Sequence, residues 1–185
     1  YNKYVKKLET VLDNFDWEIV HQLTLSLQEA WRANNTVFIC GNGGSAGNAI
    51  HLANDFNYGI DKKKGIGLRV EALPANASIL TCLANDEGYD SIFSQQLKVK
   101  ANQNDVLIAL SGSGKSQNVV NALEVSNYIG MSTFAILGYS GGKCKELAKH
   151  PIHFEIEDMQ IAEDLQLIVG HMCMQWLAEN GKGEA

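Results

Sequence analysis

The chain has 185 residues, of which 45% are hydrophobic and 19% charged, and its net charge is −6. This is ordinary globular composition, and it excludes wholesale disorder, a collagen-like repeat and a coiled coil. An acidic chain without a long basic run is a poor candidate for a general binder of nucleic acid or membrane surfaces, so we expect neither as a partner. A local phosphate site stays compatible with this charge, because backbone N–H groups hold phosphate without Lys or Arg.

The four cysteines, Cys40, Cys82, Cys144 and Cys173, lie far apart and form no CxxC pair. This spacing predicts free thiols rather than a disulfide scaffold or a thiolate zinc site. Free thiols, together with the absence of a signal peptide and of an apolar run of roughly 18 residues, predict a cytoplasmic location.

Apolar residues recur every three to four positions over residues 3–32, which predicts helix with a break near Asp13–Asp16. Short apolar runs then predict buried parallel strands at 36–40, 68–73, 105–111 and 132–138, and a weaker strand at 151–156. Helical patterns occupy 45–58, 75–84, 89–101, 116–129, 141–149 and about 159–179. The lysine run at 62–64 is expected to be a solvated loop.

Strands that alternate with helices predict an α/β fold: a doubly wound, mainly parallel five-stranded sheet with helices on both faces. The chain contains no internal repeat, no low-complexity tract and only two prolines. We therefore expect one domain over residues 1–185, with residues 1–33 as an N-terminal helical extension.

Two glycine–serine loops follow predicted strands and lead directly into helices. The first is Gly41–Ser45 (GNGGS) and the second is Ser111–Ser116 (SGSGKS). In doubly wound sheets ligands bind at the carboxyl ends of the strands, where glycines expose backbone N–H groups and a helix N-terminus attracts anions. A tight turn with serine as the helix cap is the alternative for either loop. Two such loops in one sheet favour a phosphorylated ligand.

Neither loop carries a convincing nucleotide signature. Gly41, Gly43 and Ala46 fit the loose dinucleotide fingerprint GxGxx[GA], which is a weak signal and leaves an oxidoreductase only as a minor option. An ATP-binding P-loop that ended at Ser116 would need glycine where Ala109 stands. We therefore expect no nucleotide cofactor.

Two helices carry ionisable side chains among apolar residues. His51 and Asp55 share a face at positions i and i+4, and the C-terminal helix carries Glu163, Asp164 and His171. Glu163 lies roughly 80° around the helix from His171, so spacing alone does not bring these two together. The set would suit proton transfer beside a carbonyl or a tetrahedral metal such as zinc, while a satisfied histidine beside a surface acid is the alternative.

Four segments together resemble the sugar isomerase (SIS) domain family, and within it the phosphoheptose isomerases. They are CGNGGSAGNAIHLANDF, LANDEGYDSIFSQQL, DVLIALSGSGKSQNVVNAL and AEDLQLIVGHMCMQWL, and they span about residues 35–179 in the family's order. The resemblance implies a homotetramer with active sites at subunit contacts. It also implies isomerisation between ketose and aldose forms of a sugar phosphate, with sedoheptulose 7-phosphate, a precursor for heptose biosynthesis, as the expected substrate.

The resemblance also assigns roles to individual positions. Substrate binding falls on Asn42, Gly43, Gly44, Ser45, Asp55, Asn85, Asp86, Ser111, Gly112, Ser113, Ser116 and Glu163. Zinc or another divalent metal would be held by His51, Asp55, Glu163 and His171. Catalysis is expected from Asp55 or Glu163 as the base and from His171 as a proton shuttle, through an enediol.

The sequence departs from the family pattern at several of these positions. Asp55 stands where Glu is usual, Glu163 where Gln is usual and Gly112 where Thr is usual. The segment after Asp55 lacks the expected Gly-Arg pair, which removes a bidentate ligand contact. The alternative function is a non-catalytic SIS module that binds a sugar phosphate or a protein partner, of the regulatory or replication-initiator-binding type.

Overall fold

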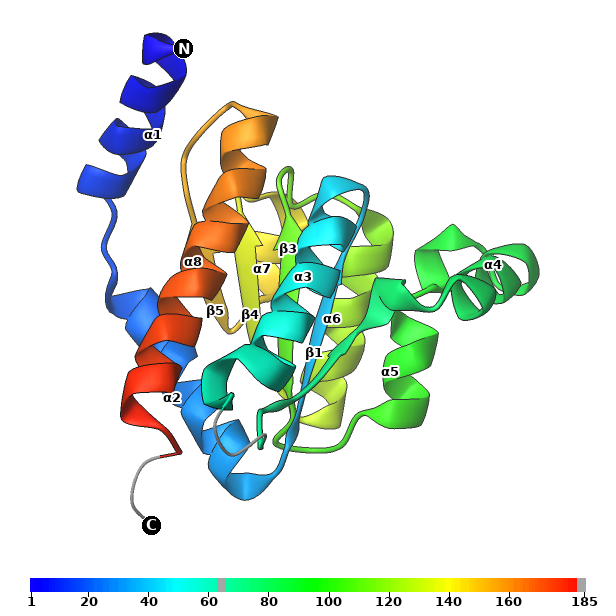
Figure 1. Cartoon of the computed structure of the whole chain (residues 1–185). Coiled ribbons are helices and arrows are strands. Elements are labelled where there is room, and N and C mark those ends of the chain that lie inside the picture. Colours follow the sequence, from blue (N-terminus) through cyan, green and yellow to red (C-terminus); the bar gives the residue numbers. More distant parts are fainter. Residues whose placement is uncertain (63–65, 183–185) are drawn as a thin grey trace.

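The computed structural model describes residues 1–62 and 66–182, and in these ranges five parallel strands form one sheet in the order β2-β1-β3-β4-β5 (Figure 1). The strands are β1 Thr36–Gly41, β2 Arg69–Ala72, β3 Val106–Ser111, β4 Ser132–Leu137 and β5 His150–His153. Each neighbouring pair in this order is parallel. The predicted doubly wound sheet is therefore confirmed. The expected lysine loop at 62–64 lies mostly outside the described residues.

The helices follow the predicted pattern closely. They are α1 Asn2–Asp13, α2 Glu18–Ala33, α3 Gly44–Tyr58, α4 Ala77–Asp86, α5 Ser94–Lys100, α6 Gln117–Ile129, α7 Gly142–Leu147 and α8 Met159–Asn180. The break near Asp13–Asp16 separates α1 from α2 as predicted. The pattern at 89–101 is not one helix, since a 3-10 turn, Tyr89–Ser91, comes first and α5 begins only at Ser94.

Two apolar layers cover the two faces of the sheet. Along β1, Val37 and Ile39 pack on the side of α2, α3 and α8, whereas Phe38 and Cys40 pack on the side of α5, α6 and α7. This alternation is what a strand buried on both faces requires. Helix α2 contributes buried side chains such as Leu27 to the first layer, so it is part of the core.

Two helices project from this body. Helix α1 buries none of its residues and leans away from the sheet at the N-terminal end of the chain (Figure 1). Helix α4 also buries no residue and stands out on the opposite side (Figure 1). Projecting amphipathic elements of this kind leave apolar side chains available for contacts with other molecules.

The order of the strands locates the functional end of the sheet. The chain passes from β1 outward to β2, then returns to β3 on the other side of β1. Between β1 and β3 the direction of winding reverses, which leaves a crevice at their carboxyl ends. The two glycine–serine loops follow these two strands.

Candidate functional site

A cavity of about 270 Å³ lies between the two loops. Its lining residues are Asn42, Gly43, Gly44, Ser45, Leu110, Ser111, Gly112, Ser113, Ser116, Met159 and Glu163. The first loop turns sharply because Gly43 has a φ of +54°, which side chains disfavour. Gly41 is required by space, since a Cβ there would lie 2.9 Å from the carbonyl oxygen of Leu110. These two glycines therefore allow both loops to line one cavity.

The serine hydroxyls of the second loop have different partners. The Ser111 hydroxyl accepts a hydrogen bond from the Gly114 N–H at 3.1 Å, and the Ser113 hydroxyl accepts one from the Lys115 N–H at 3.3 Å. Ser116 precedes α6 as its cap residue, but its hydroxyl makes no capping hydrogen bond. Its hydroxyl is therefore free of the usual capping role, at the N-terminus of a 13-residue helix.

A pair of amide side chains fastens the two loops together. Asn42 donates to the Oδ1 atom of Asn118, and Asn118 donates back to the Oδ1 atom of Asn42, both at 2.8 Å. The Tyr89 hydroxyl also donates to Asn42 Oδ1 at 2.8 Å. Sequence reasoning missed Asn118 and Tyr89. A polar residue on the otherwise apolar inner face of the predicted helix was the available signal for Asn118, which is 1% exposed.

Glu163, in the first turns of α8, reaches the same cavity from the other side of the first loop. Its carboxylate lies directly against the backbone of Gly44, so that a Cβ on Gly44 would overlap both carboxylate oxygens. Glycine at position 44 is therefore what allows the carboxylate to approach the N-terminus of α3.

A network of buried amides holds this part of α8 against α3. Asn48 donates to the carbonyl oxygen of Glu163 and to Gln166 Oε1, each at 3.0 Å. Gln166 in turn donates to the Ser45 hydroxyl at 3.0 Å. Gln166 is 1% exposed and was missed from the sequence. Its signal was an uncharged polar residue within the apolar run of the C-terminal helix.

Gly112 and Met159 form a complementary pair in the cavity wall. The Met159 thioether covers Gly112 so closely that a Cβ on Gly112 would overlap the sulfur atom. The space that a side chain at position 112 would fill is thus already occupied. Met159 is a further lining residue that sequence reasoning missed.

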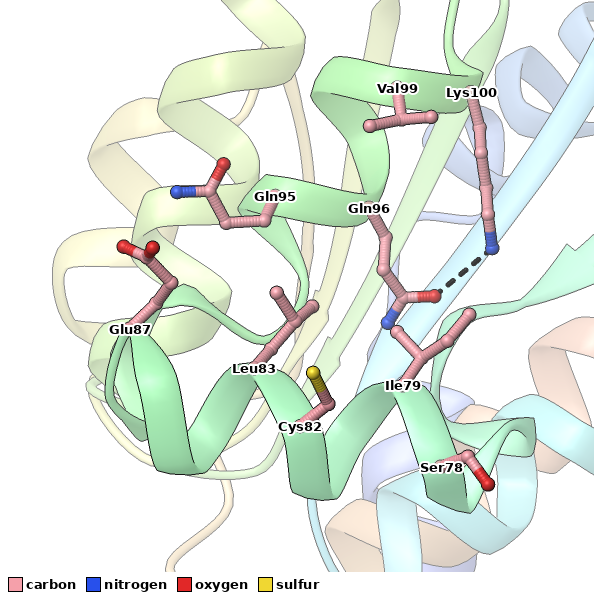
Figure 2. A pocket seen from close by; sticks show the side chains of 9 residues that line it. All are labelled: Ser78, Ile79, Cys82, Leu83, Glu87, Gln95, Gln96, Val99 and Lys100. Atoms are coloured by element: carbon pink, nitrogen blue, oxygen red, sulfur yellow. Dashed lines mark hydrogen bonds between the residues drawn. The ribbon is translucent and has the colours of Figure 1, made fainter.

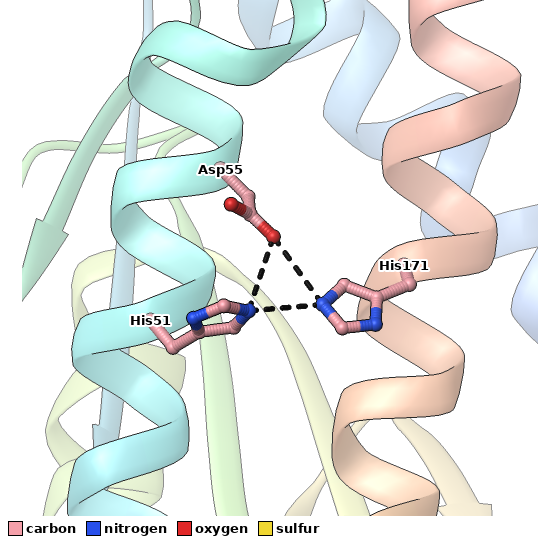
Figure 3. Close-up of side chains that lie close together, drawn as sticks. All are labelled: His51, Asp55 and His171. Carbon is pink, nitrogen blue, oxygen red and sulfur yellow. Dashed lines mark hydrogen bonds and ion pairs between the residues drawn. The ribbon is translucent and has the colours of Figure 1, made fainter.

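A second cluster lies farther along α3 and α8 and consists of His51, Asp55 and His171 (Figure 3). The Nε2 atoms of the two imidazoles are 3.0 Å apart, and Asp55 Oδ2 lies 3.3 Å from each of them. The side chain of His51 is 51% exposed and that of His171 is 42% exposed. Three of the four expected metal-binding residues therefore come together at the surface of the chain.

The geometry of this cluster fits a metal ion. Zinc bonds to nitrogen and oxygen are about 2.0–2.2 Å long, which places the ligand atoms of a tetrahedral centre about 3.3 Å apart. The Nε2 atoms of the two histidines and Oδ2 of Asp55 are separated from one another by 3.0–3.3 Å. Because both histidines turn the same ring nitrogen inward, each can offer its lone pair to one ion.

Glu163 does not join this cluster within one chain. It precedes His171 by eight positions on α8, which corresponds to about 12 Å along the helix axis. The neighbouring Asp164 is turned elsewhere and accepts a hydrogen bond from the Tyr4 hydroxyl of α1. The two neighbouring acids of the C-terminal helix therefore have different contacts: Glu163 lines the cavity, and Asp164 bonds to α1.

Asn85 and Asp86, expected to bind substrate, lie at the end of the projecting helix α4. Both are exposed, and Asn85 donates to Asp86 at 2.7 Å. Neither lines the cavity between the glycine–serine loops. Within one chain, the structure does not bring them to the other predicted substrate-binding residues.

A largely apolar pocket of about 540 Å³ separates α4 from α5 (Figure 2). Cys82 in its wall donates to Asp86 at 3.5 Å, and this hydrogen bond raises the pKa of the thiol above its ordinary value. Lys100 at its rim pairs with Gln96 and with Glu71. A raised pKa keeps the thiol protonated and therefore weakly nucleophilic, so this pocket is a poorer candidate for catalysis than the cavity between the loops.

Comparison with known proteins places this arrangement in a family. The SIS domain family matches residues 1–138. The phosphoheptose isomerase of Akkermansia muciniphila is 35% identical over 153 residues, which cover 83% of this chain and 80% of that protein. The chain belongs to the SIS domain family. Its resemblance to the phosphoheptose isomerases within that family is likewise confirmed.

Solved structures of SIS domain proteins agree with the fold. The phosphoheptose isomerase of Neisseria gonorrhoeae has a TM-score of 0.84 and 26% identity, with 96% of this chain and 92% of that chain covered. A phosphoheptose isomerase from Francisella tularensis has a TM-score of 0.89 at 19% identity, with 96% of both chains covered, and supports the fold. Among the described residues, no helix has the length and apolar character that a membrane span needs.

Proposed function

We propose that this SIS domain protein interconverts a ketose phosphate and an aldose phosphate, with sedoheptulose 7-phosphate and D-glycero-D-manno-heptose 7-phosphate as the pair. The observation that carries the proposal is the placement of Glu163 in one cavity with a serine-rich loop at the switch point of the sheet. Relatives named phosphoheptose isomerase, such as that of Akkermansia muciniphila at 35% identity, support this choice of substrate.

The phosphate group would be held by the second loop. Ser111, Ser113 and Ser116 offer hydroxyls, and the N-terminus of α6 adds its partial positive charge. Gly112 contributes its backbone N–H only, because Met159 fills the space of a side chain there. The first loop, with Asn42 fixed by Asn118, would hold hydroxyl groups of the sugar.

Proton transfer would be the task of Glu163. The family pattern has Glu at position 55 and Gln at position 163, whereas this chain has the shorter Asp55 and a charged Glu163, so the role of the base would have moved from position 55 to Glu163. In the forward direction its carboxylate removes a proton from C1 of the ketose while the C2 oxygen gains one, which gives the enediol. The same group then returns a proton to C2 while the C1 hydroxyl loses its own. C1 is oxidised and C2 is reduced within one molecule, so the reaction balances without an external oxidant.

His51, Asp55 and His171 would hold one divalent metal ion, zinc being the ion that best suits two imidazoles and a carboxylate. Such an ion would polarise the substrate carbonyl and stabilise negative charge on its oxygen. The Nε2 atom of His171 faces the centre of the cluster, so that atom cannot both bind metal and shuttle a proton. We therefore assign His171 to the metal.

The site would be completed by a second copy of the chain. The His51–Asp55–His171 cluster lies exposed, about 12 Å along α8 from Glu163, which is too far for both to act on one carbonyl within one chain. A homotetramer with active sites at its subunit contacts would bring the cluster of one copy to the cavity of another. The exposed Asn85–Asp86 pair on the projecting helix α4 is available for the same purpose.

The direct test is turnover. Purified protein is mixed with sedoheptulose 7-phosphate, with and without added zinc, and the aldose is followed by NMR. We expect conversion that ceases in the Glu163→Gln variant. If no product forms under either condition while the sugar phosphate still binds, the non-catalytic SIS module is the better description.

A cytoplasmic location is proposed with this function, and the four free cysteines support it.

A further inference from the structure

The cavity between the glycine–serine loops contains two helix N-termini. Helix α3 begins at Gly44 and has 15 residues, and helix α6 begins at Gln117, next to Ser116, and has 13. Both ends carry unpaired backbone N–H groups and the positive end of a helix dipole, so each favours one negative charge. A ligand with two anionic groups would therefore suit this cavity if both ends were free.

The N-terminus of α3 is not free, because the carboxylate of Glu163 lies against Gly44. The side chain of Gly44 is only a hydrogen atom, and this is the condition for so close an approach. The chain thus provides its own anion at one of the two positions. The N-terminus of α6, with Ser111, Ser113 and Ser116 around it, has no such occupant among the residues that line the cavity.

The backbone at Glu163 is held next to α3 by a network of hydrogen bonds. The carbonyl oxygen of Glu163 accepts a hydrogen bond from Asn48, and Gln166, one turn later, bonds Asn48 and Ser45. Three hydrogen bonds therefore fix the start of α8 on the first turn of α3. The backbone of Glu163 therefore stays beside the N-terminus of α3 as long as these hydrogen bonds persist.

Within one chain, the remaining wall of the cavity offers no cationic side chain to neutralise a second phosphate. Of the lining residues that the structure describes, Glu163 is the one that carries a formal charge, and the others are glycine, serine, asparagine, leucine and methionine. A second phosphate group would place two like charges side by side without a Lys or Arg between them. In a partly enclosed site with a lower dielectric than water, that repulsion is strong.

We infer that Glu163 restricts the cavity to sugars with a single phosphate and rejects sugar bisphosphates. The inference rests on the proposed function, since it assumes that a sugar phosphate binds with its phosphate at the second loop. It adds a role for Glu163 that is separate from proton transfer: the residue selects by repulsion which ligands enter. Specificity of this kind needs an unfavourable contact with the wrong ligand as well as favourable contacts with the right one.

The test compares binding rather than turnover. Dissociation constants are measured by calorimetry for sedoheptulose 7-phosphate and sedoheptulose 1,7-bisphosphate, with wild-type protein and with Glu163→Gln. We expect the wild-type protein to bind the monophosphate at least ten-fold more tightly than the bisphosphate. In Glu163→Gln that ratio should fall at least ten-fold, mainly because the bisphosphate binds better.

Asp164→Asn is the matched control. It removes the same formal charge one residue further along α8, where the side chain meets Tyr4 of α1 and not the cavity. Its ratio should equal that of the wild type. An unchanged ratio in Glu163→Gln, or an equal fall in Asp164→Asn, overturns the inference while leaving the proposed function in place. If neither sugar phosphate binds the wild-type protein, the proposed function and the inference both fail.

Discussion

The Nε2 atom of His51 lies 3.0 Å from the Nε2 atom of His171 on a different helix. Two neutral imidazoles can satisfy this contact only if one of them donates to the other. Two protonated rings would repel each other, and a bridging metal ion would turn the contact into a favourable one. The position of Asp55 Oδ2 at 3.3 Å from both nitrogens adds the negative charge that a divalent cation requires.

We therefore predict that the purified chain binds one zinc ion per copy. His171→Ala and His51→Ala should each lower the affinity at least 100-fold, because two ligands alone hold zinc weakly. Elemental analysis and calorimetry with zinc measure the effect. His21→Ala removes another exposed histidine, one on α2 that contacts Trp176, and should leave the zinc content unchanged. Equal zinc content in all four proteins would contradict the prediction.

The contact between α3 and α8 that positions both histidines depends on Gly170. A Cβ at this position would overlap the Leu52 side chain, and Leu52 and Gly170 are the neighbours of His51 and His171. Gly170→Ala should reduce the free energy of unfolding by about 1–3 kcal/mol through overpacking. It should also weaken zinc binding, because the two helices must move apart.

Urea denaturation and a zinc titration of Gly170→Ala measure these two effects together. Gly47→Ala is the matched control, since Gly47 lies on α3 and a Cβ there would have open space, with no neighbouring atom within 4 Å. That change should stabilise the protein by up to about 1 kcal/mol through helix propensity alone. Loss of stability in Gly47→Ala of the same size as in Gly170→Ala would show that the packing explanation is wrong.

The sheet and the two loops could be predicted from the sequence because local patterns determine them. Apolar runs bounded by polar residues mark the five strands, and glycine–serine loops follow β1 and β3, the neighbouring strands at the switch point. The pairing of His51 with Asp55 also follows from a spacing of four residues on one helix. These features depend on a few neighbouring residues in the chain.

The rest of the site depends on how two helices cross, which spacing does not reveal. The helical angle between Glu163 and His171 left their meeting open, and their separation along α8 assigns them to different places. In the sequence, Gln166 is a single polar residue in an apolar run. Its role becomes clear only from its hydrogen bonds with Ser45 and Asn48, which lie on another helix. Similarly, the overlap of Met159 with Gly112 involves side chains whose contact no local pattern encodes.

If the site is shared between copies, two inactive variants should restore each other. Glu163→Gln is expected to lower kcat by about 100- to 10,000-fold, the usual contribution of a general base. His171→Ala should be inactive for loss of the metal. When the two variants are unfolded together and refolded, some sites will combine an intact Glu163 with an intact His171, and isomerase activity should return.

The control for this mixing experiment pairs His51→Ala with His171→Ala. These two residues belong to one cluster of a single chain, so every cluster in the mixture has one defect and activity should stay absent. Absence of recovery in the Glu163→Gln and His171→Ala mixture, despite mixed oligomers on native mass spectrometry, would contradict a shared site.

Ser116 offers a test of the phosphate-binding loop that spares the fold. Its hydroxyl makes no capping hydrogen bond with α6, so Ser116→Ala should leave the melting temperature close to that of the wild type. The KM for the sugar phosphate should rise by about 10- to 100-fold, since a hydrogen bond to a charged group contributes about 1.5–3 kcal/mol. Ser26→Ala is the control. Together with Asn35 and Asn104, Ser26 lines a separate pocket, which shares no residue with the cavity between the loops, so this change should alter neither the melting temperature nor the KM.

The attachment of α1 should depend on pH at both ends of the scale. The Tyr4 hydroxyl donates to Asp164, and this hydrogen bond raises the pKa of Tyr4 from 10.0 to about 12. Lys7 lies 2.8 Å from Asp158, and its hydrogen bond lowers the pKa of that carboxyl below the ordinary 3.8. A raised pKa means that the Tyr4 contact stabilises below pH 10 and is lost as the pH rises toward 12. A lowered pKa means that the Asp158 contact stabilises above about pH 4 and is lost as the pH falls through the folded value.

Ultraviolet titration of tyrosinate should therefore show one tyrosine that ionises near pH 12, and Tyr4→Phe should remove that step. The protection of α1 amides from hydrogen exchange, measured relative to an unstructured peptide at the same pH, should be greatest between the two limits and should fall outside them. Helix α1 buries no residue fully, so these two polar contacts add to the partial packing of Leu8, Val11 and Leu12 on the core. Tyr128→Phe is the control, since that ring is 93% exposed and its loss should leave the step near pH 12 in place. If Tyr4→Phe leaves both the titration and the exchange of α1 unchanged, the Tyr4–Asp164 contact does not hold the helix in solution.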